Sequence, residues 1–489
     1  MTQAVLIVIA ILAILLGLHL FAIVWLYWQQ KQSKSALQQV SVYLVVYASQ
    51  SGHAEVWAKH TAEQLRLLDD QVIVKDIQDL SHDDLIQQHR ILWVVSTYGE
   101  GDAPDSARSF VNKFFTERLD LSHLSFSVLA LGDRRYANFC QFGRTLEQWL
   151  VQQQAQVLFD TVLVDQMNSR DLEQWLSGLE QLTSIQFSDL AHSHPMLQLK
   201  FAHRQCLNKG SVGEPIYKVQ LIGDEDLTWS SGDILEIQCE NDLHEIHDFL
   251  GSQQQPVNAE LTAQLSALNL RKLPAKAEQS FEQWVEKFER LARREYSIAS
   301  LPENGLIELV VRQQHTITGL GLGSGWLTQG LQQDQLLQAR IRHNPSFHLP
   351  HDDRPLILIG NGTGIAGLLA HLRQREHWGY QQNWLIFGER QQQFDHLYHA
   401  EIHYWQQHGF LDQVDYAFSR DQAEKIYVQD CIKAQSARLQ SWIHQGAAIY
   451  VCGSLKGMAS GVDQALKEVL GLDLVTQLKQ EQRYQRDVY

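Results

Sequence analysis

The chain has 489 residues, of which 44% are hydrophobic, and a formal net charge of −16. This length allows about three domains of ~150 residues each, and the negative charge argues against a nucleic-acid backbone as a partner. Its five cysteines are scattered without metal-ligand spacing. They indicate free thiols in a reducing compartment and predict no metal site.

Residues 4–28 form one apolar run that is interrupted only by Gly17 and His19. As a helix this run would be ~37 Å long, which exceeds the ~30 Å hydrocarbon layer of a bilayer. Lys31 and Lys34 follow it directly, so the positive-inside rule places the N-terminus outside. The sequence predicts a transmembrane anchor at 1–30, a linker at 31–41, and a single-pass inner-membrane protein with its catalytic domains in the cytoplasm. A buried core helix is the alternative.

Residues 42–185 alternate short apolar runs with helix-length amphipathic segments. This alternation predicts a doubly wound parallel sheet, in which ligands bind beyond the carboxyl ends of the strands. The segment holds 20 acidic and 11 basic residues, a net charge of −9. The charge serves solubility or forms an acidic docking face for a basic redox partner. The apolar runs are 42–48, 72–75, 91–95, 126–131 and 157–164.

Three loops after these runs carry residues suited to a phosphate and a flat ring. Hydroxyls and bare N–H groups before a helix bind phosphate, and glycines beside a tyrosine allow a ring to approach and stack. After the first run come Ser49, Gln50, Ser51, Gly52, His53 and Ala54; after the third, Ser96, Thr97, Tyr98 and Gly99; after the fourth, Leu131, Gly132, Asp133 and Tyr136.

This segment resembles the flavodoxin-like FMN domain of diflavin reductases, the family of cytochrome P450 reductase and the sulfite reductase flavoprotein. The resemblance implies that residues 49–54 hold the FMN phosphate and that Tyr98 and Tyr136 flank the flavin ring. The other residues of the three loops, together with Cys140, are placed in the same FMN site. Packing at a helix edge is the alternative for both tyrosines.

The middle segment, 195–350, predicts an antiparallel barrel, because its strands follow one another without intervening helices. An insertion at about 241–290 interrupts them and is predicted to be helical, with Phe281, Trp284, Val285 and Phe288 at helical spacing. The predicted strands are 197–206, 215–222, 233–239, 295–300, 306–312 and 335–342.

Two motifs of this segment resemble the FAD motifs of ferredoxin-reductase-like barrels. They are Arg294-Glu295-Tyr296-Ser297 and the loop from Gly321 to Ser324. The resemblance implies that Arg294, Gly321 and Ser324 bind the FAD diphosphate, that Tyr296 packs on the flavin, and that Ser297 lies near the flavin N5. A plain surface strand is the alternative. The insertion is much shorter than the connecting domain of diflavin reductases.

Residues 351–489 are predicted to form an α/β domain that resembles the NADP domain of ferredoxin reductases. Gly362, Thr363 and Gly364 follow the strand 355–359 and open a helix, as a nucleotide-binding turn requires. Further strands are predicted at 384–388, 415–418 and 448–451. An arginine rather than an acid near the ribose favours NADP over NAD. The residues that resemble the family's 2′-phosphate and adenine clamp are Ser419, Arg420, Lys425, Tyr427 and Gln429.

The last predicted strand ends in Cys452, and the chain ends at Tyr489. The resemblance makes Cys452 a neighbour of the nicotinamide and stacks Tyr489 over the FAD. It places Asp487 with Ser297 and Cys452 around the hydride path, so that these four residues form the catalytic set. The chain departs from the family pattern at Gly367, Ser454 and Gly461.

These predictions describe electron flow from NADPH through FAD and FMN to a one-electron haem or iron protein, whose identity cannot be read from the sequence. The anchor favours a membrane-anchored NADPH–haemoprotein reductase. One alternative is the flavoprotein component of assimilatory sulfite reductase, with a sirohaem subunit as its partner. An alternative of another class is a flavin-binding membrane sensor without turnover.

Overall fold

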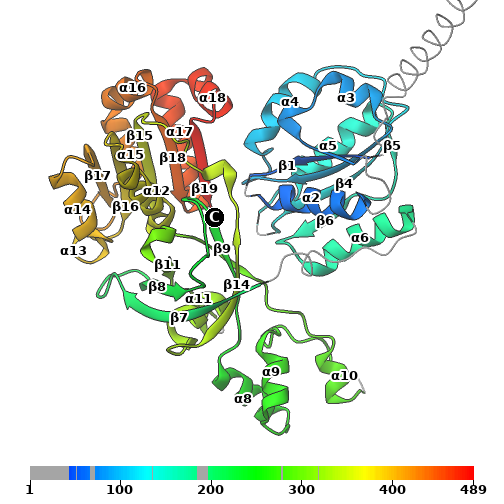
Figure 1. Ribbon diagram of the computed structural model, residues 1–489, viewed down its shortest axis with the longest axis horizontal. Coiled ribbons are helices and arrows are strands. Elements are labelled where there is room, and N and C mark those ends of the chain that lie inside the picture. Colours follow the sequence, from blue (N-terminus) through cyan, green and yellow to red (C-terminus); the bar gives the residue numbers. More distant parts are fainter. Residues whose placement is uncertain are drawn as a thin grey trace, which may run out of the picture.

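The computed structural model describes residues 43–50, 52–66, 72–134, 136–183, 196–276, 279–317 and 319–489. The predicted anchor and linker, with Ser51, lie outside these residues. None of the helices within the described ranges has the length and apolarity needed to cross a membrane. A flavodoxin-like α/β part, a barrel with a small helical insertion, and a C-terminal α/β part follow one another along the chain (Figure 1).

The first part is a parallel sheet in the order β2-β1-β3-β4-β5, with β6 also paired to β4. Alternate side chains of each strand enter opposite layers: Val46 packs with helices α4 and α5, and Val45 with α2 and α6. The predicted run 157–164 is divided between two short strands. The strands are β1 (Leu44–Ala48), β2 (Ile73–Asp76), β3 (Arg90–Ser96), β4 (Ser125–Gly132), β5 (Gln156–Val157) and β6 (Val162–Asp165). The helices are α2 (His53–Arg66), α3 (His82–Gln87), α4 (Arg108–Phe114), α5 (Gln141–Gln152) and α6 (Ser169–Thr183).

The strand order reverses between β1 and β3, because the chain turns to β2 on one side and then crosses to the other. This doubly wound, flavodoxin-like arrangement confirms the predicted fold of the segment. Ligands of such sheets bind outside the carboxyl ends of the strands at the point of reversal. The predicted phosphate loop, residues 49–54, and the Tyr98 loop are therefore at the position where the fold places a ligand.

The middle part is an antiparallel sheet in the order β10-β9-β14-β7-β8-β11. A bridge between Ile298 and Leu309 joins its two ends and closes the barrel. The antiparallel pairing agrees with the prediction, and β7 has the predicted bounds. The strands are β7 (Leu197–Cys206), β8 (Ile216–Ile222), β9 (Ile234–Gln238), β10 (Arg294–Ser297), β11 (Ile307–Arg312) and β14 (Leu336–Arg342), beside a hairpin of β12 (His315–Thr316) and β13 (Gly319–Leu320).

The insertion is helical, as predicted, and extends away from the barrel (Figure 1). It has a hydrophobic core of its own, in which α8 packs on α9 and α10. Phe288 belongs to this core although α10 ends before it. Asp242, Asn258 and Ser280 cap the three N-termini with their side chains. The helices are α8 (Leu243–Ser252), α9 (Ala259–Ser266) and α10 (Phe281–Val285).

The C-terminal part is a parallel sheet in the order β17-β16-β15-β18-β19. Its last strand, β19, was not predicted: the sequence analysis treated the C-terminal residues as a terminal segment only. Three consecutive polar residues, Gln485, Arg486 and Asp487, occupy the middle of this strand, so the sequence lacks the apolar alternation that predicts a strand. The strands are β15 (Leu356–Asn361), β16 (Asn383–Glu389), β17 (Gln413–Phe418), β18 (Ala448–Gly453) and β19 (Tyr484–Val488). The main helices are α12 (Ile365–Trp378), α14 (His399–Gln407), α15 (Val428–Ala434), α16 (Ser436–His444), α17 (Ser460–Leu470) and α18 (Leu472–Gln480).

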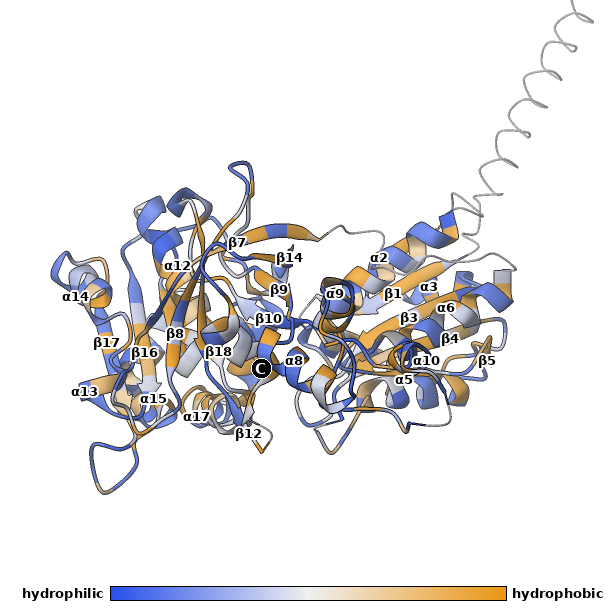
Figure 2. Ribbon diagram, turned by 90° about the horizontal axis from the view of Figure 1, so that it is seen from below, coloured by the Kyte–Doolittle hydropathy of each residue, from blue (hydrophilic) through white to orange (hydrophobic). Residues whose placement is uncertain are grey.

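The barrel and the C-terminal sheet share one hydrophobic core, which contains Ile216 and Val310 of the barrel beside Leu358 and Leu368. Figure 2 shows the hydrophobic residues gathered along the strands, while many loops and helix surfaces are hydrophilic. The shared core also contains Ala299, which follows β10, and so holds this part of the barrel against the C-terminal sheet.

Candidate functional site

The phosphate loop follows β1 and leads into α2, a helix of 14 residues. Gly52 has a φ of +85°, which glycine adopts without steric cost. Ser49 Oγ is buried and has no hydrogen-bond partner among the described atoms. A bare turn with a buried hydroxyl before a helix N-terminus fits the phosphate of FMN, because both supply donors to an anion.

The loops after β1, β3 and β4 are hydrogen-bonded to one another. Gln50 N donates to Ser96 Oγ at 3.3 Å, and Thr97 N donates to Leu131 O at 2.8 Å. The structure thus brings together the three loops that the sequence analysis chose. Their predicted ligand roles remain a proposal.

The Tyr98 loop also contacts the C-terminal strand. The guanidinium of Arg486 lies over the Tyr98 ring, 4.5 Å from its centroid, and Arg486 Nη2 is 3.0 Å from both carboxylate oxygens of Asp105. Gln50 Nε2 donates to Asp105 Oδ2 at 3.2 Å. Arg486 therefore joins β19 to the segment after β3, and Asp105 in turn links this contact to the phosphate loop through Gln50. This contact was not predicted.

The remaining residues of the predicted FMN set lie in or beneath the loop after β4. Tyr136 is half-buried, and its N donates to Asp133 O at 3.1 Å. Cys140 is fully buried, and a Cβ atom on Gly132 would lie 2.8 Å from its sulfur. Burial raises the pKa of Cys140 to about 12, so this thiol packs as an apolar group beneath the loop.

The two predicted FAD segments are in contact on the barrel. A Cβ atom on Gly323 would lie 2.5 Å from Arg294 Cγ, so the arginine side chain rests on segment 321–324. This segment was predicted as a loop, but the short helix α11 (Leu322–Gly325) already begins within it. Tyr296 packs against the barrel core. A guanidinium beside a glycine-rich loop fits the FAD diphosphate, since both donate to phosphate oxygens.

The four predicted catalytic residues come together where the barrel meets β18 and β19. Ser297 Oγ donates to Asp487 Oδ2 at 2.7 Å, and Cys452 Sγ lies 3.8 Å from the same oxygen. Asp487 is the register partner of Cys452 in the parallel pairing of β18 with β19. A Cβ atom on Gly367 would lie 3.2 Å from Cys452 Sγ, so the glycine leaves room for the thiol.

Electrostatics at this cluster favour protonated groups. Burial raises the pKa of the Asp487 carboxyl, while the Ser297 hydrogen bond and Arg342 oppose the rise. Burial also raises the pKa of Cys452 well above its usual range, and the nearby Asp487 carboxylate adds to the rise. A carboxyl with a raised pKa beside a hydroxyl and a thiol can hold or move a proton near a reacting centre.

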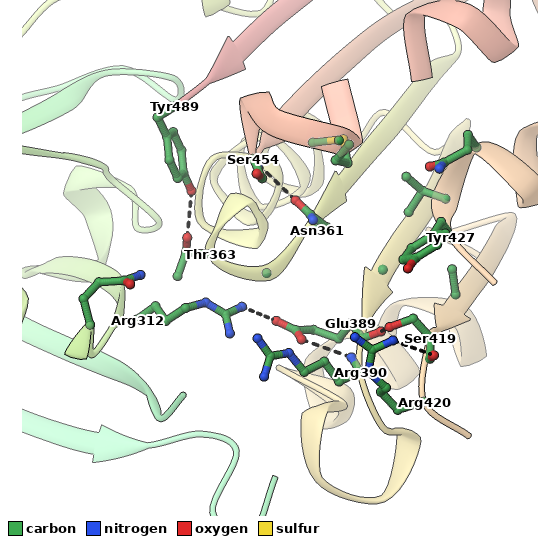
Figure 3. A pocket seen from close by; sticks show the side chains of 18 residues that line it. Arg312, Asn361, Thr363, Glu389, Arg390, Ser419, Arg420, Tyr427, Ser454 and Tyr489 are labelled. Carbon is green, nitrogen blue, oxygen red and sulfur yellow. Dashed lines mark hydrogen bonds and ion pairs between the residues drawn. The ribbon is translucent and has the colours of Figure 1, made fainter. Parts of the chain in front are cut away.

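Tyr489 stands at the edge of the adjoining pocket (Figure 3). Its hydroxyl is hydrogen-bonded to Thr363 Oγ1 at 3.0 Å, and its N donates to Gly453 O at 3.0 Å. The residue is 55% exposed. One hydrogen bond thus holds the ring hydroxyl and another holds the backbone, while the residue remains open to solvent.

The pocket beside Tyr489 has a volume of about 730 Å³ and lies at the carboxyl ends of β15, β16 and β17. The turn that opens α12 requires glycine, because a Cβ atom on Gly364 would lie 2.1 Å from Cys452 O. Gln429 Oε1 is buried without a hydrogen-bond partner in the described structure. Of the predicted residues, those lining the pocket are Gly362, Thr363, Ser419, Arg420, Tyr427, Gln429 and Tyr489; Lys425 lies beyond its lining.

Several residues of this pocket were not predicted, among them Arg312, Asn361, Glu389 and Arg390. Arg312 comes from the barrel, and Glu389 ends β16. A signal was present for Glu389, because the carboxyl ends of neighbouring parallel strands meet at one edge. The arginines Arg312, Arg390 and Arg420 give the pocket the positive charge that a multiply phosphorylated nucleotide needs.

The two sheets, the barrel and their loops define an oxidoreductase that binds FMN, FAD and NADPH. Residues 45–176 match the family described as Flavodoxin, and residues 358–464 match the one described as Oxidoreductase NAD-binding domain. A sulfite reductase (NADPH) flavoprotein alpha-component from Yersinia enterocolitica is 30% identical over 91% of this chain and 89% of its own length. The corresponding proteins of Mannheimia succiniciproducens and Bacillus subtilis are 29% and 28% identical over the same shares. The chain belongs to the diflavin reductase family.

These comparisons correct two predictions. The membrane-anchored haemoprotein reductase was the wrong choice of acceptor class, since the relatives carry the name of the flavoprotein that was ranked second. The predicted inner-membrane localisation is wrong as well, because it was part of the same choice of protein class. Among the described helices, none could cross a membrane. The apolar run 4–28 has the length of a membrane-spanning helix but carries no information about the electron acceptor, and it lies outside the described residues.

Proposed function

We propose that the chain is the flavoprotein component of an NADPH-dependent sulfite reductase and delivers electrons to a separate haemoprotein subunit. The observation that carries this proposal is the similarity to flavoproteins of that name over 91% of the chain. The division into parts supports it, because the flavodoxin-like part is separate from the hydride site and can present its cofactor to a partner.

The hydride site is proposed to act through residues of four chain segments. Bound FAD and FMN supply the conversion of one hydride into two single electrons. Arg294 and segment 321–324 hold the FAD diphosphate, and Ser297 and Cys452 orient the nicotinamide. Asp487 holds or releases a proton beside them, and Tyr489 covers the flavin until the nicotinamide replaces its ring.

The flavodoxin-like part is proposed to bind FMN at residues 49–54 and between Tyr98 and Tyr136. Its net charge of −9 over residues 42–185 suits electrostatic steering of a basic surface on the haemoprotein. In the NADPH pocket, Ser419, Arg420 and Tyr427 are proposed to hold the adenosine 2′-phosphate, which discriminates against NADH.

Reconstitution with a sirohaem sulfite reductase subunit tests the proposal. The purified chain should release FMN and FAD in equal amounts and should support sulfite-dependent NADPH oxidation once the subunit is added. Reduction of cytochrome c without any sulfite-dependent oxidation would contradict the assignment of the acceptor. Failure of NADPH to bleach the bound flavin would contradict turnover altogether and restore the sensor alternative.

A further inference from the structure

The NADPH pocket contains a buried carboxylate, although its ligand carries several negative charges. Glu389 is 8% exposed, and its Oε1 lies 2.6 Å from Arg312 Nη2. Its Oε2 accepts a hydrogen bond from Arg390 N at 3.1 Å. Figure 3 shows this pair in the cavity, between the Tyr489–Thr363 contact and Ser419 with Arg420.

Arg312 belongs to β11 of the barrel, so its ion pair with Glu389 crosses between two parts of the molecule. A Cβ atom on Gly362 would lie 2.7 Å from Arg312 Nη2 and 3.4 Å from Glu389 Oε1. The guanidinium therefore faces the bare turn that opens α12, a helix of 14 residues. Turns of this kind hold the diphosphate of a dinucleotide.

The position of Arg312 along the pocket matches the middle of NADPH. Ser419 and Arg420 mark the proposed 2′-phosphate end, and Thr363 with Tyr489 marks the nicotinamide end. A diphosphate joins these two ends of the dinucleotide, and Arg312 is the pocket cation beside the Gly362 turn. A guanidinium can donate two parallel hydrogen bonds to phosphate oxygens.

We propose that Arg312 is a diphosphate ligand of NADPH and that Glu389 sets the affinity of the site by competing for this guanidinium. This inference rests on the proposed placement of NADPH in the pocket. NADPH must draw Arg312 away from Glu389, and the carboxylate then lies close to the bound phosphates. Burial raises the pKa of Glu389 and the nearby Asp395 adds to the rise, while Arg312 and Arg390 oppose it.

Calorimetric titration of the full chain with NADP⁺ and with 2′-AMP, which lacks the diphosphate, separates the roles. Arg312→Gln should weaken NADP⁺ binding by about 10- to 100-fold, as expected for hydrogen bonds to a charged group. It should leave the affinity for 2′-AMP within about twofold. Arg420→Gln is the matched control and should weaken both ligands.

Glu389→Gln provides the opposite test, because it should tighten NADP⁺ binding by about three- to tenfold while 2′-AMP is unaffected. A gain in affinity cannot result from a misfolded variant. If Arg312→Gln lowers the affinity for both ligands equally, or Glu389→Gln lowers the affinity for NADP⁺, the ion pair only connects the two parts structurally. The inference then fails. If Arg420→Gln changes neither ligand, the placement of NADPH itself is wrong.

Discussion

The barrel meets its two neighbours through interfaces of different chemistry. Towards the C-terminal sheet it shares a hydrophobic core, in which Ile216 and Val310 pack with Leu358 and Leu368. Towards the flavodoxin-like part the contacts are polar: His53 Nε2 lies 2.6 Å from Glu295 Oε1, and Ser346 Oγ donates to Gln50 O at 2.9 Å. Within the described ranges, no hydrophobic cluster combines residues of these two parts.

This difference indicates at which of the two interfaces the parts can separate. Apolar area removed from water stabilises by about 25 cal/mol per Å², so separating the shared core is costly. Polar contacts exchange readily with water, and polar interfaces between domains permit relative motion. The proposed hydride site thus lies at the apolar junction between the barrel and the C-terminal sheet, here called the permanent junction. The proposed FMN loops face the polar junction of the flavodoxin-like part, here called the separable junction. An electron carrier that reaches an external acceptor needs this division.

The largest expected effect comes from a substitution that removes a titratable group at the permanent junction and leaves the hydrophobic packing unchanged. Asp487→Asn should slow flavin reduction by NADPH about 100-fold or more, since general acid–base groups contribute at that level. Anaerobic stopped-flow absorbance measures this rate. Ser297→Ala should act in the same direction, because its hydroxyl donates to this carboxyl. Unchanged reduction in both variants, with full flavin content, would remove the assignment.

The next effect is on the separable junction, to which β19 of the C-terminal part also contributes through Arg486. Arg486→Gln removes the ion pair with Asp105 and the contact over Tyr98. Loss of a buried charge partner costs about 2 kcal/mol or more, so the flavodoxin-like part should spend more time undocked. Small-angle X-ray scattering should report a larger radius of gyration for this variant.

Arg108→Gln is the matched control for that experiment. Arg108 also pairs with Asp105, at 2.9 Å, but belongs to the same part of the chain. It should leave the scattering profile unchanged. Equal expansion in the two variants would show that Asp105 acts only within its own part, and the role of Arg486 in docking would be lost.

A smaller effect concerns the acid sensitivity of the permanent junction. His371 is fully buried between Phe347 and Tyr450, and burial lowers its pKa to about 3. Below pH ~6.5 the imidazole is protonated in the unfolded chain but stays neutral in the folded chain. The free energy of unfolding therefore falls by about 1.4 kcal/mol per pH unit. Stability should therefore fall as the pH drops from 6.5 towards 3.

Denaturant unfolding at pH 7 and pH 5.5 measures this loss. His371→Leu should reduce the difference between the two conditions, because the buried imidazole is gone. His377→Leu, on the exposed side of the same helix, should keep the wild-type difference. If the His371 variant loses as much stability as wild type, another group causes the acid sensitivity.

The smallest effect is expected at the edge of the separable junction. His53 and Glu295 are 19% and 36% exposed in their side chains, and exposed ion pairs contribute about 0–1 kcal/mol. His53→Asn should reduce docking only slightly, with a radius of gyration between those of wild type and Arg486→Gln. Its docking should also depend less on salt, because screening weakens exposed charge pairs first. A change larger than that of Arg486→Gln would reverse the proposed ranking of the two contacts.

The separable contacts also show why part of the site could not be predicted. Ser49, Tyr98, Arg294 and Arg420 could be proposed as site residues because each lies in a loop or strand with a local signature. Arg486 and Asp105 are 381 positions apart, and neither stands in a motif that names the other. Glu389 lies at a strand's carboxyl end, yet its partner Arg312 comes from a different sheet.

Local patterns by themselves determined the alternation of strands and helices, the bounds of β7, and the loops proposed to hold three cofactors. They could do so because apolar periodicity and glycine-rich turns act over a few residues. Only the tertiary structure decided that the polar C-terminal residues form β19, that Arg312 meets Glu389, and which junction is apolar. Those outcomes depend on surfaces that exist only after the sheets have formed and packed.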